Sequence, residues 1–405
     1  MRAAPQASAP ATGAASLSAP VGAPSPAAPS AGSSHFLEHL LFKGTERRSA
    51  IAIAEAIDCV GGEMNAFTTK EYTAFYVRLL ADSLDVGLDI LSDIMWSPAF
   101  RPDDVESERQ VILEEILMHG DEPGDLVHEL FFDAMYPGHP LGWDPLGDEG
   151  TVSSLGAADI RAFHAEHYRP GNIVAAAAGC VDHDRLVAGL EDRFAGVTGG
   201  EVPRRQAPTG PTRPVTVLSR QTEQAHLVVG MPAVDREDPD RYPLSVVDHV
   251  LGGGMSSRLF QEVREKRGLA YSVYSFRAGF ADGGVLGVYA GTAPSRVHET
   301  LEVILTEIDR LANAGITERE LTVAKGHLRG TMALGLEDSA ARMSRIGRSQ
   351  LIHGEIPSID EVAAKIDEVT VDDVNRVIAK VLTRDRVLAA VGPFDEDAFD
   401  SARVA

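Results

Sequence analysis

The spacing of hydrophobic residues predicts an alternation of helices and short strands along most of the chain. Apolar positions three and four residues apart predict helices over 49–60, 81–96, 157–168 and 184–194. Alternating or short continuous apolar runs predict strands over 64–68, 72–79 and 172–178. Between about 119 and 153, glycine, proline and aspartate accumulate, so we expect a loop-rich segment there.

Part of this pattern recurs about 200 residues later along the chain. A helix beginning near Asp159 and followed by the strand at 172–178 is echoed by a helix near Asp373 and a strand over 386–391. A repeat of this length is too long for a solenoid unit and favours two duplicated α+β domains.

Two segments break the pattern and set the expected domain boundaries. Residues 1–32 are rich in alanine, proline and serine, with no acidic or aromatic residue and one basic residue, Arg2. Such a tract buries too little apolar surface to offset the entropy of ordering, so we expect it to be disordered. Residues 196–214 lack an apolar period and read as a linker. The predicted domains are therefore 33–200 and 212–405.

Composition narrows the classes of partner. The 405-residue chain has a net charge of −23, which argues against a nucleic-acid partner because phosphate binding needs basic surface. No apolar run is long enough to cross a membrane, so no membrane partner is expected. Cys59 and Cys180 show no metal-binding spacing or disulfide pattern. We expect both to be buried, in a reducing and therefore cytoplasmic compartment.

The segment His35-Phe36-Leu37-Glu38-His39 carries the strongest chemical signal. On a helix, His35, Glu38 and His39 fall within an arc of roughly 100°. Two imidazoles at this spacing can bind one zinc ion, and the carboxylate beside them can act as a general base. An accidental match is expected in roughly one chain in thirty of this composition. The apolar neighbours indicate a buried helix, which Ser34 can cap and Gly44 can end.

A third zinc ligand is expected on the helix predicted over 101–116. Its buried stripe is defined by Val105, Val111, Ile112 and Ile116. Helical phase places Glu108 and Glu115 inside that stripe and Glu114 outside it. We assign Glu115 as third ligand and Glu108 as a carboxylate that supports the ligands. From the helix alone, a solvated acidic face is about as probable as a ligand site.

Several motifs together resemble one family. These are His35–Thr45, Gly61–Thr68, the segment ending Val111-Ile112-Leu113-Glu114-Glu115, His139–Gly142, and Ser257–Tyr271. They resemble the pitrilysin/insulinase family of zinc peptidases with the inverted His-x-x-Glu-His motif, and within it the bacterial homologues of the mitochondrial processing peptidase β subunit. The resemblance covers about residues 33–395.

The resemblance implies a fold, a reaction and further site residues. Each of the two homologous α+β domains would be an antiparallel sheet with helices packed on one side, and the domain over 33–200 would bind one Zn²⁺ per chain. The chain would be a zinc metalloendopeptidase that hydrolyses peptides or unfolded segments inside a clamshell chamber, with Glu38 as the base. Asn65, Ala66 and Phe67 would bind the substrate as an added strand.

The resemblance also assigns Arg264 and Tyr271, seven residues apart in the second domain, to catalysis. They would contact the substrate at the zinc site of a partner chain, so a homodimer or a heterodimer with a related subunit is expected. The simpler interpretation is that Arg264 is one charge in the solvated run 262–267 and that Tyr271 begins a strand.

An alternative function remains open. Some members of the family serve as non-catalytic partner or structural subunits. Residues 1–32 depart from the family, which has two strands and a glycine-rich turn at this place. We expect the reading frame or start site to differ from that of the homologues, which would leave a compromised product. The complete candidate ligand set favours the peptidase by about four to one.

Overall fold

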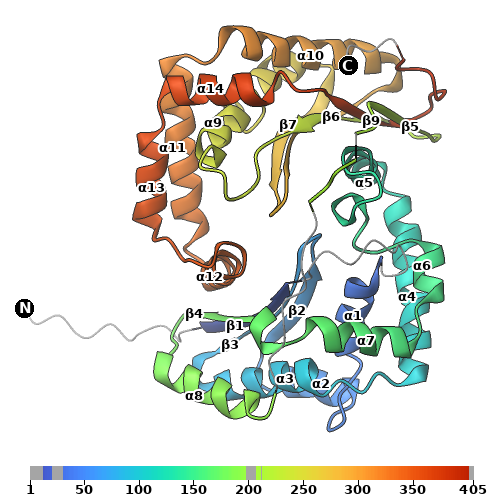
Figure 1. Ribbon diagram of the computed structural model, residues 1–405, viewed down its shortest axis with the longest axis vertical. Coiled ribbons are helices and arrows are strands. Elements are labelled where there is room, and N and C mark those ends of the chain that lie inside the picture. The colour runs from blue at the N-terminus through green and yellow to red at the C-terminus, as the bar shows by residue number, and fades with distance from the viewer. Residues whose placement is uncertain (1–11, 21–30, 198–206, 211, 401–405) are drawn as a thin grey trace, which may run out of the picture. The chain divides into compact units, whose positions relative to one another are not determined.

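The computed structural model describes residues 12–20, 31–197, 207–210 and 212–400, and it is an α+β structure with two compact units (Figure 1). The first unit contains the described residues up to Ile116, 144–197 and Leu334–Ile356. The second contains Leu117–Trp143, the described residues of 207–333, and 357–400.

The sheet of the first unit has four antiparallel strands in the order β2-β3-β1-β4. The strands are β1 (Thr12–Pro20), β2 (Glu63–Thr68), β3 (Tyr72–Leu80) and β4 (Val174–Ala178). Helices α1 (Ser33–Leu41), α2 (Ala50–Asp58), α3 (Leu84–Trp96) and α7 (Ala157–His167) form one apolar core with alternate residues of β3. Phe75, Val77 and Leu79 point into this core, as the period of two requires.

A helix distant in sequence covers the opposite face of this sheet. Helix α12 (Ser339–His353) packs on β1 and β4, and Figure 1 shows it on this side of the sheet. Its Met343 is buried against Ala176. Residues 334–356 therefore cluster with the first unit, whereas the expected boundaries place them in the second domain. The sequence pattern did not indicate this exchange because β4 and α12 are more than 160 residues apart.

The strand β1 corrects the expectation that residues 1–32 are disordered throughout. Its backbone pairs with β3 from Thr12↔Leu80 to Pro20↔Tyr72 and with β4 from Ala14↔Ala178 to Ser18↔Val174. Without it, the facing edges of β3 and β4 would leave a row of backbone groups unpaired. Backbone pairing does not depend on side-chain hydrophobicity, so composition was a poor guide here. The remaining expectation, on 1–11 and 21–30, lies outside the described residues.

The sheet of the second unit has five strands in the order β5-β9-β6-β8-β7. They are β5 (Val215–Ser219), β6 (Ala225–Pro232), β7 (Ala270–Gly279), β8 (Gly284–Thr292) and β9 (Val387–Gly392). The pair β5–β9 is parallel and the other pairs are antiparallel. The expectation of a purely antiparallel sheet is therefore wrong for this unit.

Both faces of the second sheet are covered by helices. Leu388 and Ala390 of β9 face the core built with α9 (Arg241–Leu251), α10 (Val297–Ala314) and α14 (Val371–Val381). Val387, Ala389 and Val391 face α5 (Pro123–Met135), which supplies Val127 and Phe131. The expectation of helices on one side only is thus corrected in both units. Helix α5 also replaces part of the loop expected over 119–153, because its apolar face is complete only against β9 and β6.

Other elements surround these layers. The remaining helices of four residues or more are α4 (Pro102–Gly120), α6 (Glu149–Ser154), α8 (His183–Phe194), α11 (Glu318–Gly335), α13 (Ile359–Glu368) and the π-helix η5 (Phe260–Glu265). In the described residues no helix is long and apolar enough to cross a membrane. Cys59 and Cys180 are exposed, contrary to the expectation that they are buried.

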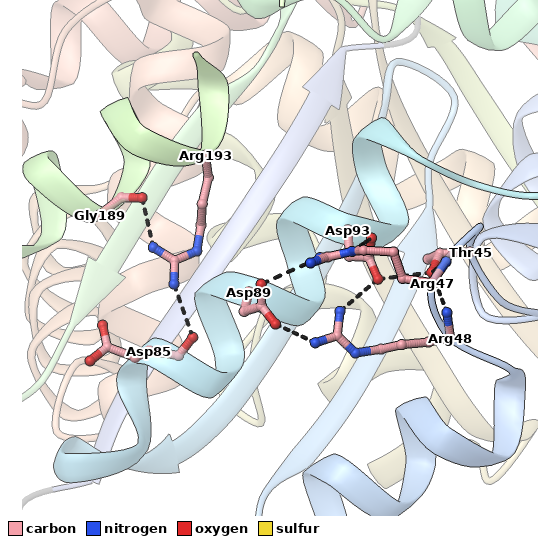
Figure 2. Close-up of polar contacts among 8 residues, drawn as sticks. All are labelled: Thr45, Arg47, Arg48, Asp85, Asp89, Asp93, Gly189 and Arg193. Carbon is pink, nitrogen blue, oxygen red and sulfur yellow. Dashed lines mark hydrogen bonds and ion pairs between the residues drawn. The ribbon is translucent and has the colours of Figure 1, made fainter. Parts of the chain in front are cut away.

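A polar network ties the turn after α1 to α3 (Figure 2). The carboxylate of Asp93 accepts hydrogen bonds from Thr45 Oγ1 at 2.8 Å, Arg47 Nε at 2.9 Å and Arg48 Nη1 at 2.6 Å. Both arginines also pair with Asp89, one turn earlier on α3. Because Asp93 is buried at a helix face, this network fixes where the chain leaves α1.

Candidate zinc-binding active site

Helix α1 presents the His-x-x-Glu-His motif from the core of the first unit. It begins after Gly32, whose φ of +82° favours glycine and where a Cβ would lie 2.8 Å from the Leu146 carbonyl oxygen. Ser34 does not cap the helix as expected. It lies inside the first turn, and its Oγ is 2.9 Å from Thr73 Oγ1. The helix ends at Leu41, three residues before Gly44.

Three side chains converge at the surface of α1. The ligand atoms of His35, His39 and Glu115 lie within 4.8 Å of one another. Glu115 Oε2 is 3.6 Å from His35 Nε2 and 3.4 Å from His39 Nε2. Two ligands bound to one tetrahedral zinc ion at 2.0–2.2 Å lie about 3.3–3.6 Å apart. The donor set and its spacing therefore fit zinc, and the structure brings together the three residues predicted as ligands.

Glu108 lies behind this cluster, where the prediction placed it. Its Oε2 is 3.1 Å from His39 Nδ1, and its other oxygen forms an ion pair with Lys43. Glu108 is 4% exposed, so Lys43 and His39 are the groups that offset the cost of burying its charge. A proton held on His39 Nδ1 by Glu108 leaves Nε2 as the ring nitrogen that can bind a metal.

The pKa values of the two histidines shift in opposite directions. Burial and the neighbouring His39 lower the pKa of His35. Burial by itself would also lower the pKa of His39, but hydrogen bonds to Glu115 and Glu108 outweigh it and raise that pKa. At a given pH, a larger fraction of His35 than of His39 is therefore the neutral imidazole that binds a metal.

Glu38 is buried beside the ligands and held by a threonine. Thr68 Oγ1, at the end of β2, donates a 2.5 Å hydrogen bond to Glu38 Oε2. Burial raises the pKa of Glu38, and this hydrogen bond opposes the rise. Tyr168 is buried nearby; burial and the charge of Glu38 raise the pKa of the Tyr168 hydroxyl. A carboxylate with a raised pKa accepts a proton more readily than an ordinary one.

The three carboxylates of helix α4 face the directions that helical phase predicted. Glu108 is buried, Glu115 reaches the ligand cluster and Glu114 is exposed. The prediction that Val111 belongs to the buried stripe is wrong, because Val111 is 47% exposed. The buried face is centred on Val105, Glu108 and Ile112.

The predicted substrate strand lies at an edge of the first sheet. Strand β2 pairs only with β3 among the described strands, so its outer backbone groups face away from the sheet. Met64 and Ala66 pack on the apolar core, which places Asn65 and Phe67 on the opposite face. Phe67 is 40% exposed.

Arg264 and Tyr271 form a pair within the second unit. The Arg264 guanidinium carbon lies 4.5 Å from the centre of the Tyr271 ring, and Arg264 Nη1 donates to the Tyr271 carbonyl oxygen at 3.2 Å. The stretch between them is not helical throughout, because η5 ends at Glu265 and Tyr271 lies in β7. Tyr271 is 79% exposed, an orientation suited to contact with a second molecule.

Three residues that influence the predicted ligands or the predicted base were not predicted from the sequence: Thr68, Lys43 and Asp144. Thr68 holds Glu38, and Lys43 neutralises Glu108. Burial lowers the pKa of His35, and the charge of Asp144 joins that of Glu115 in opposing this shift only in part. Lys43 follows His39 by four residues, so helical spacing could have indicated it. Nothing local in the sequence connects Thr68 or Asp144 with α1.

Comparisons with known proteins match most of this chain. Residues 4–149 match the family model described as insulinase, peptidase family M16, and 154–328 match the model described as the peptidase M16 inactive domain. An uncharacterized zinc protease of Streptomyces coelicolor is 48% identical over 90% of this chain and 81% of its own. The uncharacterized zinc protease YmxG of Bacillus subtilis is 38% identical over 89% of this chain and 88% of its own.

Two solved structures share the fold. A peptidase M16 inactive domain from Pseudomonas fluorescens has a TM-score of 0.87 at 24% identity, covering 95% of this chain and 93% of that one. A protease from Helicobacter pylori has a TM-score of 0.85 at 22% identity, covering 94% of each chain.

Proposed function

The chain belongs to the insulinase family, peptidase family M16, and we propose that it is a zinc metalloendopeptidase. The observation that carries the proposal is the set His35, His39 and Glu115 at zinc-ligand spacing, with Glu38 buried beside it. A family member that serves only as a scaffold has no need to keep this spacing.

The chain's own residues divide the work of hydrolysis. A zinc ion held by the three ligands would polarise the scissile carbonyl group and lower the pKa of a water molecule. Because Thr68 occupies Glu38 Oε2, the other carboxylate oxygen takes the proton of the attacking water. Glu38 then delivers that proton to the leaving amine. Glu108 keeps His39 in the required orientation.

The substrate class is peptides and unfolded polypeptide segments. Among the described residues no strand pairs with the outer edge of β2, where the Ala66 N–H donates to Asn65 Oδ1 at 2.8 Å. An extended peptide that displaces this local contact can add to the edge as a further strand. Asn65, Ala66 and Phe67 would then contact alternate sides of that peptide. A folded protein cannot present such a strand without local unfolding.

The dimer and the roles of Arg264 and Tyr271 belong to the same proposal. An arginine can polarise a carbonyl oxygen, and a tyrosine hydroxyl can stabilise the developing oxyanion. Both residues are in the second unit, whose described residues form no cluster of metal-ligand type. We therefore propose that a partner subunit supplies them to a substrate enclosed between chains. The narrower likeness to the mitochondrial processing peptidase β subunit stays a prediction of the sequence.

Zinc content and turnover together test the peptidase. The purified protein should hold about one zinc per chain by metal analysis and should cleave a quenched fluorescent peptide. Glu38→Gln should keep the zinc and lose at least about a hundredfold in kcat, since an amide cannot accept the proton. His35→Ala and His39→Ala should lose the metal. Full zinc with no cleavage of any peptide would favour the non-catalytic subunit instead.

A further inference from the structure

A pocket lies on the face of the first sheet that carries α12. The side chains of Phe67 on β2 and of Tyr72 and Tyr76 on β3 point to this face, opposite to the core residues of the same strands. Together with α12 they enclose about 480 Å³. All the residues that line this pocket belong to the first unit.

The lining combines aromatic rings with positive charge. Helix α12 contributes the cations Arg345 and Arg348 and the imidazole ring of His353, and no aspartate or glutamate lines the pocket. The rings of Phe67 and Tyr72 lie 5.9 Å apart and form its other wall. In a chain with 60 acidic and 37 basic residues, a pocket with this lining is a local exception.

Arg348 gives the pocket an available cation. Its side chain is exposed, and it makes no ion pair or hydrogen bond within the part of the chain that the structure describes. A guanidinium group binds a carboxylate through two parallel hydrogen bonds, and aromatic walls strengthen this contact by excluding water. The ligand that matches this lining is a carboxylate on an apolar stem.

The pocket is next to the strand on which the substrate is expected to lie. Phe67 lines the pocket and also belongs to the edge strand β2. A peptide added to that edge directs every second side chain to the face of Phe67 and α12, and the others to the core face. One of these side chains can therefore reach the pocket while the backbone stays paired with β2.

We propose that this pocket binds an aspartate or glutamate side chain of the substrate and makes the enzyme prefer peptides with an acidic residue at one fixed distance from the cleaved bond. The inference rests on the proposed peptidase function. It assigns Arg348 the recognition of the carboxylate and Phe67 the contact with its apolar stem.

A positional scan tests this preference. A single glutamate is moved through an uncharged, C-terminally amidated peptide, and each peptide is compared with its glutamine counterpart after mass spectrometry has located the cut. At one position, glutamate should raise kcat/KM about tenfold, the effect of one charge-assisted hydrogen bond. At the two adjacent positions the ratio should stay near one, because those side chains face the other way. A flat scan would overturn the proposal.

Charge reversal identifies the residue responsible. Arg348→Gln should bring the glutamate-to-glutamine ratio close to one, and Arg348→Glu should favour a lysine peptide instead. Arg319→Gln is the matched control, because Arg319 on α11 is exposed and makes no ion pair in the described part of the chain; it should keep the wild-type ratio. An unchanged ratio in both Arg348 variants would remove Arg348 from recognition and overturn the assignment.

Two further experiments cover the cases in which the pocket binds a peptide C-terminus and in which the protein cleaves no peptide. Peptides with a free C-terminus and no glutamate test whether the pocket binds the chain end; a preference that follows only the terminal carboxylate contradicts the side-chain proposal. If no peptide is cleaved by the zinc-loaded protein, the proposed function fails, and the pocket is then tested by fluorescence anisotropy with Glu38→Gln protein. Tighter binding of the glutamate peptide that Arg348→Gln abolishes supports the pocket, and equal affinities overturn it.

Discussion

At the residue scale, the chemistry depends on which carboxylate contacts which imidazole nitrogen. Glu115 faces the Nε2 atoms of both histidines, whereas Glu108 contacts only Nδ1 of His39. A group that shares the metal and a group that orients a ligand should respond differently to the same change from carboxylate to amide. The chain offers Glu114, on the same helix but exposed, as a control for both.

Glu115→Gln should weaken zinc binding by at least about a hundredfold, because a neutral amide is a poor zinc ligand. Glu114→Gln should change zinc affinity by less than about twofold, since its side chain points to solvent. Competition with a chromogenic chelator measures both affinities. Equal effects, or the reverse order, would show that Glu115 is not the third ligand.

Glu108→Gln should give an intermediate result. The amide still accepts a hydrogen bond from His39 but no longer neutralises Lys43, so zinc affinity should fall roughly tenfold and kcat/KM should fall further. Activity at saturating zinc, measured beside chelator competition, separates the two effects. Complete loss of zinc at saturating metal would instead make Glu108 a ligand.

At the scale of elements, the position of α1 depends on α3. Asp93 on α3 receives hydrogen bonds from Thr45, Arg47 and Arg48, all in the turn that follows α1 (Figure 2). Burial alone would raise the pKa of Asp93, but the hydrogen bonds from Arg48, Thr45 and Arg47 outweigh it and hold that pKa below its ordinary value. The ionised network therefore stabilises the junction between the two helices.

Asp93→Asn should lower the free energy of unfolding at pH 7 by about 2–4 kcal/mol, because it removes a buried charge from two arginines. A carboxyl group with a depressed pKa in the folded state stabilises the fold above its unfolded pKa of about 3.9 and loses this effect as the pH falls through the folded pKa. The gap between wild type and Asp93→Asn should therefore narrow below about pH 4.

Urea unfolding followed by circular dichroism from pH 7 to about pH 2.5 measures this gap through the range in which it should narrow. Asp85→Asn is the control on the same helix: Asp85 pairs with Arg185 at the surface, so its loss should cost less than about 1 kcal/mol. A gap for Asp93→Asn that is independent of pH would mean that packing, not charge, accounts for the loss.

At the scale of the whole molecule, two units of related architecture carry different chemistry. The described residues include one cluster of metal-ligand type, in the first unit, and the pair Arg264–Tyr271 is in the second. If these act on one substrate from two chains, each dimer contains two composite sites. Such an arrangement makes activity a property of the dimer.

Mixing Glu38→Gln protein with Tyr271→Phe protein should restore activity that neither has alone. After random exchange, half of the dimers are mixed and each mixed dimer has one intact site, so about one quarter of wild-type activity is expected. Exchange is verified with differently tagged subunits. An active monomer in sizing experiments, or no recovery after verified exchange, would rule out the composite site.

The sequence determined those features that depend on neighbours along one element. His35, Glu38 and His39 lie within five residues on one helix, so their common face follows from helical geometry alone. The same periodicity distinguished Glu115 from Glu114 and located β2 and β3 to within a residue. Wherever the signal is the spacing of side chains on one helix or strand, it is present before folding is complete.

Only the tertiary structure decided the pairings between distant segments. Strand β1 is ordered by the edges of β3 and β4, and α12 crosses from the second half of the chain to cover the first sheet. Thr68 reaches Glu38, and Arg348 reaches the face of Phe67, for the same reason. Each of these contacts joins segments far apart in sequence. The periodicity of one segment shows which of its faces is buried, but it does not show which distant segment covers that face.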